Sequence, residues 1–422
     1  MKVLISAYAC QPGMGSEPGV GWNVVEQVAK QHDVWVLTRA NNRAAIEAAL
    51  RARPMPRVRF CYLDVLGWSR RWRPQQVGRT VRLHYYLWQL RAYAAARRLQ
   101  RAVGFDVCHH VTYVQYAAPS LLALLPVPFV WGPVGGGESA PASFHRSFGR
   151  RGRRYERLRD LSRRLAERDP LVGLTARRCA LALAMTPDTA ARLRALGARR
   201  IEPLSESGMR SEEIAALAAL PMPAPPPLRF VSIGRLLHWK GFYLGLEAFA
   251  AAQLPAAEYW ILGAGPERRR LEEIARAHGL GERVRLRGHL PRQAALAALA
   301  ECHVLVHPSL HDSGGWVCLE AMAAGRPVLC LNLGGPAVQV TEKTGVRISA
   351  VTPDQVIRDL ADEMRRFADN PELLMTMGAA GRERIRTEFD WNIKGQYLVN
   401  IYRKVSAGAA SVGAKEPVRC AS

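Results

Sequence analysis

Two carboxylates stand eight positions apart in a stretch whose pattern predicts strand, loop and helix in turn. Asp312 lies in a loop rich in Ser and Gly that follows the apolar run 304–306. Glu320 lies inside the helix predicted for 317–324, which Gly325 is placed to end. A carboxylate inside such a helix suits hydrogen bonds from ribose hydroxyls, so the spacing indicates a nucleotide site. The alternative interpretation makes Asp312 a loop cap and Glu320 a solvated helix residue.

The junction between this loop and this helix suits a phosphate group. Gly314 and Gly315 let a ligand approach the backbone closely, and Trp316 follows them directly. The first N–H groups of a helix, together with its dipole, attract anions. A second apolar run at 328–331 predicts another strand, which places the loop at the strand ends where doubly wound sheets bind nucleotides. Gly314, Gly315 and Trp316 are therefore candidate ligand-binding residues.

Two cations follow another predicted strand, at 228–233. Arg235 and Lys240 are five positions apart, with a glycine beside each of them. Such a pair suits a diphosphate, because Arg binds phosphate oxygens in a bidentate manner and Lys acts as a point charge. The alternative interpretation is a pair of surface cations with no ligand.

The N-terminal region begins with a strand–helix–strand pattern. The apolar run 3–7 leads into a Gly- and Pro-rich loop that contains Gly19, and a helix is predicted for 22–30 before a second strand at 33–38. The glycine spacing does not match the dinucleotide-binding fingerprint. A glycine-rich turn of this kind can be structural, or it can contact phosphate.

Two histidines, His109 and His110, end a predicted strand. Neighbouring residues on a strand face opposite sides, so the sequence does not decide which of the two points toward a ligand. The alternative interpretation is that both are structural residues.

Composition bounds the class of protein. The 422 residues suffice for two domains, and 59 Lys and Arg against 36 Asp and Glu give a net charge of +23. Arginines concentrate at 69–101, where no acid occurs, and at 143–178, where twelve arginines face four acids. We expect the basic stretches to contact an anionic membrane surface or a lipid pyrophosphate, with a solvated helix face as the alternative. No nucleic-acid motif is present, so nucleic acid is not an expected partner.

Cysteine usage and hydropathy indicate a cytoplasmic protein. The eight cysteines are scattered without a C-x-x-C pair, which argues against a zinc site or a disulfide framework. The N-terminus reads as a first strand rather than a secretory signal, and no apolar run is long enough to span a membrane. We expect peripheral attachment at the inner face of the cytoplasmic membrane.

The string from Pro308 to Val328 resembles the signature of the GT-B retaining glycosyltransferases, the family 4 or group 1 type that includes sucrose and glycogen synthases. That signature is an acid, seven residues, a Glu and an Ala-Met-Ala-x-Gly-x-Pro-Val tail. This sequence has Asp312 where the family usually has Glu. The resemblance covers nearly the whole chain and is strongest from 234 to 327.

The resemblance assigns roles to the candidate residues. It implies that Asp312 contacts the donor sugar, that Glu320 binds the ribose, and that Gly314, Gly315 and Trp316 complete the donor site. Arg235 and Lys240 would bind the donor diphosphate, as catalytic as well as binding residues. Gly19 lies near the loop that closes over the donor phosphates in the family. His109 aligns better than His110 with the family's Asp-x-x-His segment and would be catalytic.

The expected fold is α/β, of the GT-B type, with two doubly wound Rossmann-like domains facing a cleft. The Pro-rich stretch 221–227 separates an acceptor-side domain at 1–220 from a nucleotide-sugar domain at 221–390, and 391–422 form a helix crossing back and a tail. No Asp-x-Asp occurs, so we expect transfer without metal or other cofactor, and the resemblance implies retention.

The predicted function is a hexosyltransferase of bacterial polysaccharide biosynthesis. Its partners would be a UDP- or GDP-sugar and a lipid-linked or polysaccharide acceptor. Two alternatives stay open: a nucleotide-sugar 2-epimerase-like enzyme of the same fold, and a non-catalytic basic adaptor at a membrane. The epimerase would turn over nucleotide sugar without an acceptor, and the adaptor would bind none.

Overall fold

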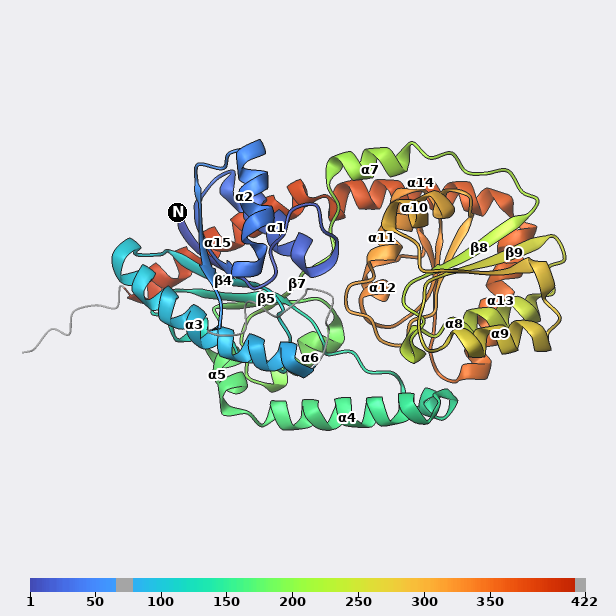
Figure 1. Ribbon diagram of the computed structural model, residues 1–422, viewed down its shortest axis with the longest axis horizontal. Coiled ribbons are helices and arrows are strands. Elements are labelled where there is room, and N and C mark those ends of the chain that lie inside the picture. The colour runs from blue at the N-terminus through green and yellow to red at the C-terminus, as the bar shows by residue number, and fades with distance from the viewer. Residues whose placement is uncertain (66–78, 414–422) are drawn as a thin grey trace, which may run out of the picture. The chain divides into compact units, whose positions relative to one another are not determined.

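The computed structural model describes residues 1–65 and 79–413 (Figure 1). The chain forms two compact units, each built from separate stretches of sequence. The first unit comprises Met1–Gly136, Arg163–Glu206 and Trp391–Ser422, and the second comprises Gly137–Ser162 and Ser207–Asp390. Arg70, Arg71 and Arg73, which begin one predicted basic stretch, lie outside the described residues.

The first unit is built on a parallel sheet with strand order β3-β2-β1-β4-β5-β6-β7. Every residue of β4 and β5 is buried, as expected when helices cover both faces of a parallel sheet. The strands are β1 (Lys2–Ala7), β2 (Asp33–Arg39), β3 (Val58–Leu63), β4 (Val107–Thr112), β5 (Phe129–Val134), β6 (Leu181–Ala184) and β7 (Ile201–Pro203).

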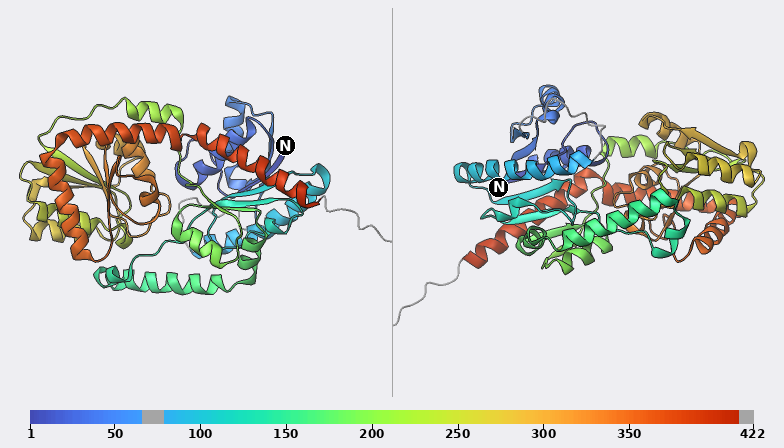
Figure 2. Two further views of the ribbon diagram at one scale, coloured as in Figure 1. Left: turned by 180° about the vertical axis from the view of Figure 1, so that it is seen from behind. Right: turned by 60° about the horizontal axis from the view of Figure 1, so that its bottom comes forward.

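Helices lie on both faces of this sheet (Figures 1 and 2). One face carries α3, α5 and α6, whose buried side chains share a core cluster with β4 and β5. The C-terminal helix α15 packs against α1, so closely that a Cβ on Gly395 would lie 2.6 Å from Cβ of Gln27. The helices are α1 (Ser16–Ala29), α2 (Arg43–Ala52), α3 (Arg79–Val103), α5 (Pro170–Arg178), α6 (Pro187–Ala195) and α15 (Trp391–Gly413).

The second unit has a parallel sheet of order β10-β9-β8-β11-β12-β13. The chain order turns between β8 and β11, and doubly wound sheets bind ligands at the carboxyl ends of the strands at such a point. The strands are β8 (Leu228–Ile233), β9 (Ala257–Leu262), β10 (Val284–Gly288), β11 (Val304–His307), β12 (Val328–Leu331) and β13 (Gly345–Ile348).

Two core clusters lie on the two faces of this second sheet. Helices α8 and α13 contribute to one of them, and α7, α10 and α11 contribute to the other. The helices are α7 (Ser211–Ala218), α8 (Phe242–Ala252), α9 (Arg268–Ala277), α10 (Arg292–Ala300), α11 (Trp316–Ala323), α12 (Gly334–Gln339), α13 (Pro353–Asp369) and α14 (Pro371–Arg384).

Helix α4 (Arg150–Glu167) begins in the second unit and ends in the first. Its buried face carries Gly152, Glu156 and Arg163, while most of its arginines are exposed.

Both sheets are parallel and covered by helices, which confirms the predicted α/β class with two Rossmann-like units. Across residues 1–65 and 79–413, no helix combines the length and apolar character needed to span a bilayer.

Candidate functional site

The loops that follow β8 and β11 interlock at the turning point of the second sheet. Gly241 has a φ of +65°, and a Cβ there would lie 2.0 Å from the Pro308 carbonyl oxygen, so a side chain does not fit without a shift of backbone. The Leu310 N–H donates to the Trp239 carbonyl at 2.8 Å. These contacts hold the two predicted motifs against each other.

Lys240 and Asp312 meet at this junction as an ion pair. His307, at the end of β11, places Nε2 3.2 Å from the same Asp312 carboxylate oxygen. Burial by itself would raise the pKa of Asp312, but Lys240 and His307 hold it well below its usual range. Burial lowers the pKa of His307, so the imidazole is neutral and donates to the carboxylate. Asp312 is therefore an ionised carboxylate in a fixed position.

Arg235, the other predicted cation, lies apart from this pair. Its side chain is exposed, and no ion pair links it to another residue of the described ranges. The structure thus brings Lys240 and Asp312 together and leaves the Arg235 guanidinium open to solvent.

The Asp312 loop is held by a glycine turn and by the side chains of Ser207 and Gln339, which both donate to the Gly314 carbonyl. The Gly335 N–H donates to the Asp312 carbonyl at 2.7 Å, and a Cβ on Gly335 would lie 2.1 Å from the Ser313 carbonyl oxygen. Ser207 Oγ donates to the Gly314 carbonyl at 2.6 Å. The loop backbone is therefore fixed by contacts that do not involve a ligand.

Helix α11 begins at Trp316, directly after Gly315. Gly315 has a φ of +59° and, having no side chain, leaves the first N–H groups of the helix without a side-chain cap. The Trp316 indole N–H is buried and has no hydrogen-bond acceptor within the described residues. This helix start can accept an anion, as the sequence predicts for Gly314, Gly315 and Trp316.

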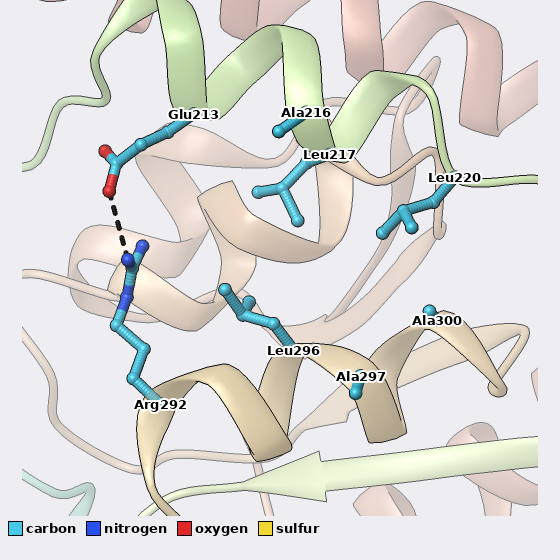
Figure 3. Close-up of a pocket in the computed structure, with 8 residues that line it drawn as sticks. All are labelled: Glu213, Ala216, Leu217, Leu220, Arg292, Leu296, Ala297 and Ala300. Carbon is cyan, nitrogen blue, oxygen red and sulfur yellow. Dashed lines mark hydrogen bonds and ion pairs between the residues drawn. The ribbon is translucent and has the colours of Figure 1, made fainter.

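Glu320 lies one turn into α11 and forms an ion pair with Arg292 of α10. Arg292 Nε lies 2.9 Å from Glu320 Oε1. Arg292 Nη1 also lies 3.0 Å from Glu213 Oε1 of α7, a contact that Figure 3 shows. Burial raises the pKa of Glu320, with Arg292 opposing the shift. Glu320 is therefore neither isolated nor fully solvated, and one of its oxygens is committed to Arg292.

A cavity of about 250 Å³ lies beside this ion pair, between α7 and α10 (Figure 3). Apart from the ends of Glu213 and Arg292, its walls are apolar. The lining residues are Glu213, Ala216, Leu217, Leu220, Arg292, Leu296, Ala297 and Ala300.

Sequence reasoning missed the side chains that the stretch Gly137–Ser162 brings to these loops. Ser313 Oγ donates to Glu138 at 2.5 Å. Glu156 of α4 accepts hydrogen bonds from His238 and His311, one from each of the two interlocked loops. In the sequence, Glu156 is one acid within an Arg-rich stretch, and no spacing connects it to residues some 80 and 155 positions away.

Gly19 is buried in α1, in the first unit. A Cβ on Gly19 would lie 2.0 Å from the Met14 carbonyl oxygen, so the glycine permits a close approach of backbone. Beside it, Glu17 accepts a hydrogen bond from the Tyr113 N–H at 2.9 Å, and burial raises the pKa of Glu17 to about 7.

His109, which the sequence predicts to be catalytic, is a buried residue of the first unit. Its Nε2 lies 2.6 Å from the Gly132 carbonyl oxygen and its Nδ1 lies 2.6 Å from the Tyr402 hydroxyl. Burial lowers its pKa to about 4, so the ring is neutral, with Nε2–H donating to Gly132. His110 is also buried and meets the Tyr85 hydroxyl at 3.1 Å. Both histidines face core, because helices cover both sides of β4.

Residues 223–384 match the family model described as glycosyl transferases group 1. The chain is 32% identical over 216 residues to the lipopolysaccharide core biosynthesis glycosyltransferase LpsD of Rhizobium meliloti, covering 49% of this chain and 58% of that protein. It is 30% identical over 237 residues to the putative colanic acid biosynthesis glycosyltransferase WcaL of Escherichia coli, covering 53% and 57%. The chain thus spans about half the length of the curated relatives it matches.

Solved structures share the fold over nearly the whole chain. The sucrose-phosphate synthase of Thermosynechococcus elongatus superposes with a TM-score of 0.62 at 19% identity, covering 96% of this chain and 99% of that one. HepE of Anabaena, solved with UDP and glucose, gives a TM-score of 0.57 at 17% identity, covering 97% and 100%. The fold is that of the GT-B glycosyltransferases, as predicted.

Proposed function

We propose that the protein is a hexosyltransferase that moves a sugar from a nucleoside diphosphate to a glycan or lipid-linked acceptor. The observation that carries this proposal is the pairing of Lys240 with Asp312 beside the uncapped start of α11, at the carboxyl ends of β8 and β11. The group 1 match over the same region supports it. Relatives named for lipopolysaccharide core and colanic acid biosynthesis favour a cell-surface polysaccharide as the product.

The chemistry we propose is electrostatic. The departing nucleoside diphosphate gains negative charge, and fixed positive groups stabilise that charge in the transition state. Lys240 supplies a point charge, the exposed Arg235 supplies a bidentate donor, and the start of α11 supplies N–H groups. We propose that these groups act without a metal ion, since the sequence has no Asp-x-Asp.

Asp312 has two roles in the proposed mechanism. It holds the Lys240 ammonium in place, and it contacts a hydroxyl of the donor sugar. Glu320 binds the ribose through the oxygen that Arg292 does not use. Retention of anomeric configuration is part of the proposal, and His109 is left out of the chemistry because both its ring nitrogens are bonded in the core. We assign acceptor binding to 1–220 and donor binding to 221–390, with 391–422 as a helix that crosses back to the first domain and a tail.

The first test is a screen of UDP- and GDP-sugars by thermal stabilisation and nucleoside diphosphate release, with a chelator present. We expect one donor to raise Tm and to be hydrolysed slowly. Glu320→Gln should weaken the binding of that donor about tenfold, because a charged hydrogen bond contributes roughly 1.5–3 kcal/mol. The matched control is Glu342→Gln, whose side chain is 93% exposed.

The outcomes separate the alternatives. Turnover of nucleotide sugar without any acceptor would indicate the epimerase, and no stabilisation by any nucleotide would leave the adaptor. Loss of release in chelator would overturn the metal-independent mechanism, and unchanged donor affinity in Glu320→Gln would remove Glu320 from the ribose site.

A specific feature of α4 favours an anionic membrane surface as a further partner. Leu158, Leu161 and Leu165 are 62%, 53% and 59% exposed, and their spacing places them on one helix face. Exposed arginines of the same helix lie beside them, at positions 154, 157 and 164. An apolar stripe flanked by arginines suits the headgroup region of an anionic bilayer.

Vesicle sedimentation tests this partner. Leu161→Ser with Leu165→Ser should lower binding to vesicles containing phosphatidylglycerol several-fold, because less apolar surface enters the interface. Met375→Ser, at a side chain 59% exposed on α14, is the control and should change nothing. Equal binding of all three proteins, or binding that is insensitive to salt, would show that the face is simply solvated.

A further inference from the structure

The stretch Gly137–Ser162 belongs to the second unit, although the residues before and after it belong to the first. The first turns of α4 lie directly against the loop that carries Lys240. A Cβ on Gly152 would lie 2.9 Å from Cγ of His238, so glycine permits this approach of the helix. Phe148, just before the helix, packs edge-on against the same ring at 4.9 Å.

Glu156, one turn after Gly152, joins two loops through one carboxylate. His238 Nε2 lies 2.8 Å and His311 Nε2 lies 3.1 Å from Glu156 Oε1, and both imidazoles therefore donate to it. The carboxylate is 1% exposed. Burial by itself would raise its pKa, but the two histidine hydrogen bonds hold it at about 2. Glu156 is thus ionised at neutral pH, and Arg159 adds a cation 3.7 Å from its other oxygen.

An aromatic stack reinforces the same junction. The Trp239 ring lies between Tyr155 of α4, at 5.0 Å and 14°, and His311, at 5.2 Å and 16°. Stacked rings at these separations attract each other beyond their burial. Helix α4 therefore contacts both loops through the Glu156 carboxylate, and its Tyr155 ring stacks on Trp239, which in turn stacks on His311 of the other loop.

The bonded histidines are adjacent in sequence to the proposed chemistry. His238 is two residues before Lys240, and His311 directly precedes Asp312. We propose that Glu156 is a positioning residue that sets the Lys240–Asp312 pair by tying its two loops to α4. The catalytic role of the Lys240–Asp312 pair rests on the proposed function. The contacts that link Glu156 to the two loops are independent of that function.

The physical consequence of losing Glu156 follows from its two partners. Two buried N–H donors would lose their acceptor, and a buried donor without a partner keeps the full cost of its desolvation. The loops can recover part of this by separating, which moves Lys240 away from Asp312. A displacement of about 1 Å at a reacting group can cost on the order of 10²-fold in rate.

The test compares Glu156→Gln and Glu156→Ala with Glu342→Gln, at a glutamate of the same unit whose side chain is 93% exposed. We expect the affinity for the nucleoside diphosphate to fall at least tenfold in Glu156→Ala and less in Glu156→Gln, which keeps one acceptor oxygen. Glu342→Gln should bind as the wild type does. A double-mutant cycle with His311→Gln should be strongly non-additive, because both changes break one contact.

A second readout needs no ligand. ¹⁵N NMR of the histidine rings should show His238 and His311 as Nε2–H tautomers in the wild type. The His307 ring, which contacts Asp312, should shift in both Glu156 variants if the loop moves. A folded Glu156→Ala with wild-type nucleotide affinity and an unshifted His307 would overturn the inference. A wild type that binds no nucleotide would instead count against the proposed function, and the His307 signal would still decide the inference.

Discussion

Replacing Lys240 with alanine is expected to lower kcat at least 10²-fold, the typical loss when one transition-state electrostatic stabiliser is removed. Lys240 is the cation that the structure fixes at the turning point of the second sheet, through its ion pair with Asp312. A fixed charge costs no reorganisation during the reaction, so its removal should affect kcat more than KM. Steady-state kinetics with the donor identified in the screen measures both constants.

Lys343→Ala is the matched control, because Lys343 is an exposed lysine of the same unit. Its kcat should equal that of the wild type. Arg235→Ala should also reduce the rate. The exposed Arg235 side chain must become ordered when it binds the ligand, so the reduction should be smaller than for Lys240→Ala. A Lys240→Ala enzyme with near-normal kcat would show that Lys240 does not stabilise the departing diphosphate.

Asp312→Ala is expected to lower the free energy of unfolding by about 3 kcal/mol, since breaking a buried ion pair leaves one charge without its partner. Lys240 keeps its charge in a site where its side chain is 16% exposed. His307 loses its acceptor in the same substitution. Urea denaturation at pH 7 measures the change, with Asp362→Ala, an exposed member of an i,i+3 pair, expected to cost well under 1 kcal/mol.

The depressed pKa of Asp312 also predicts how the free energy of unfolding changes with pH. The folded pKa of Asp312 is depressed, so its stabilisation is present above the unfolded carboxyl pKa of about 3.9 and is lost as pH falls toward the folded value. Wild-type stability should therefore fall from about pH 5 downward, and Asp312→Ala should fall less steeply. Equal slopes in the two proteins would mean that the carboxylate is not held by Lys240.

The sequence alone predicts the fold class and one part of the site, for a physical reason. Strands buried on both faces are apolar runs, and these alternate with helices in both halves of the chain. Parallel strands end at the same edge of a sheet, so motifs that follow β8 and β11 must lie close together once those strands are neighbours. The contact between Lys240 and Asp312 follows from that rule.

The rest of the site depends on contacts that sequence spacing does not encode. Arg292 reaches Glu320 from a separate helix, 28 positions away, so the predicted ribose ligand already has a partner. His109 lies within β4, where every residue is buried, so the alternation of side chains along the strand does not show which histidine faces a ligand. Glu156 comes from an Arg-rich stretch whose composition predicts contact with anionic lipid groups and gives no sign of a contact with these two loops.

The second unit is built from two separate stretches of sequence, so a fragment that contains only one of them is incomplete. A fragment that begins at Ser207 and ends at Asp390 would keep every strand of the second sheet but would lack Gly137–Ser162. Trp239 would lose one stacked neighbour, and the histidines of both loops would lose their shared acceptor. Such a fragment should refold with the loops after β8 and β11 disordered. A synthetic peptide covering residues 137–162, added in trans, should bind to the fragment and order these two loops.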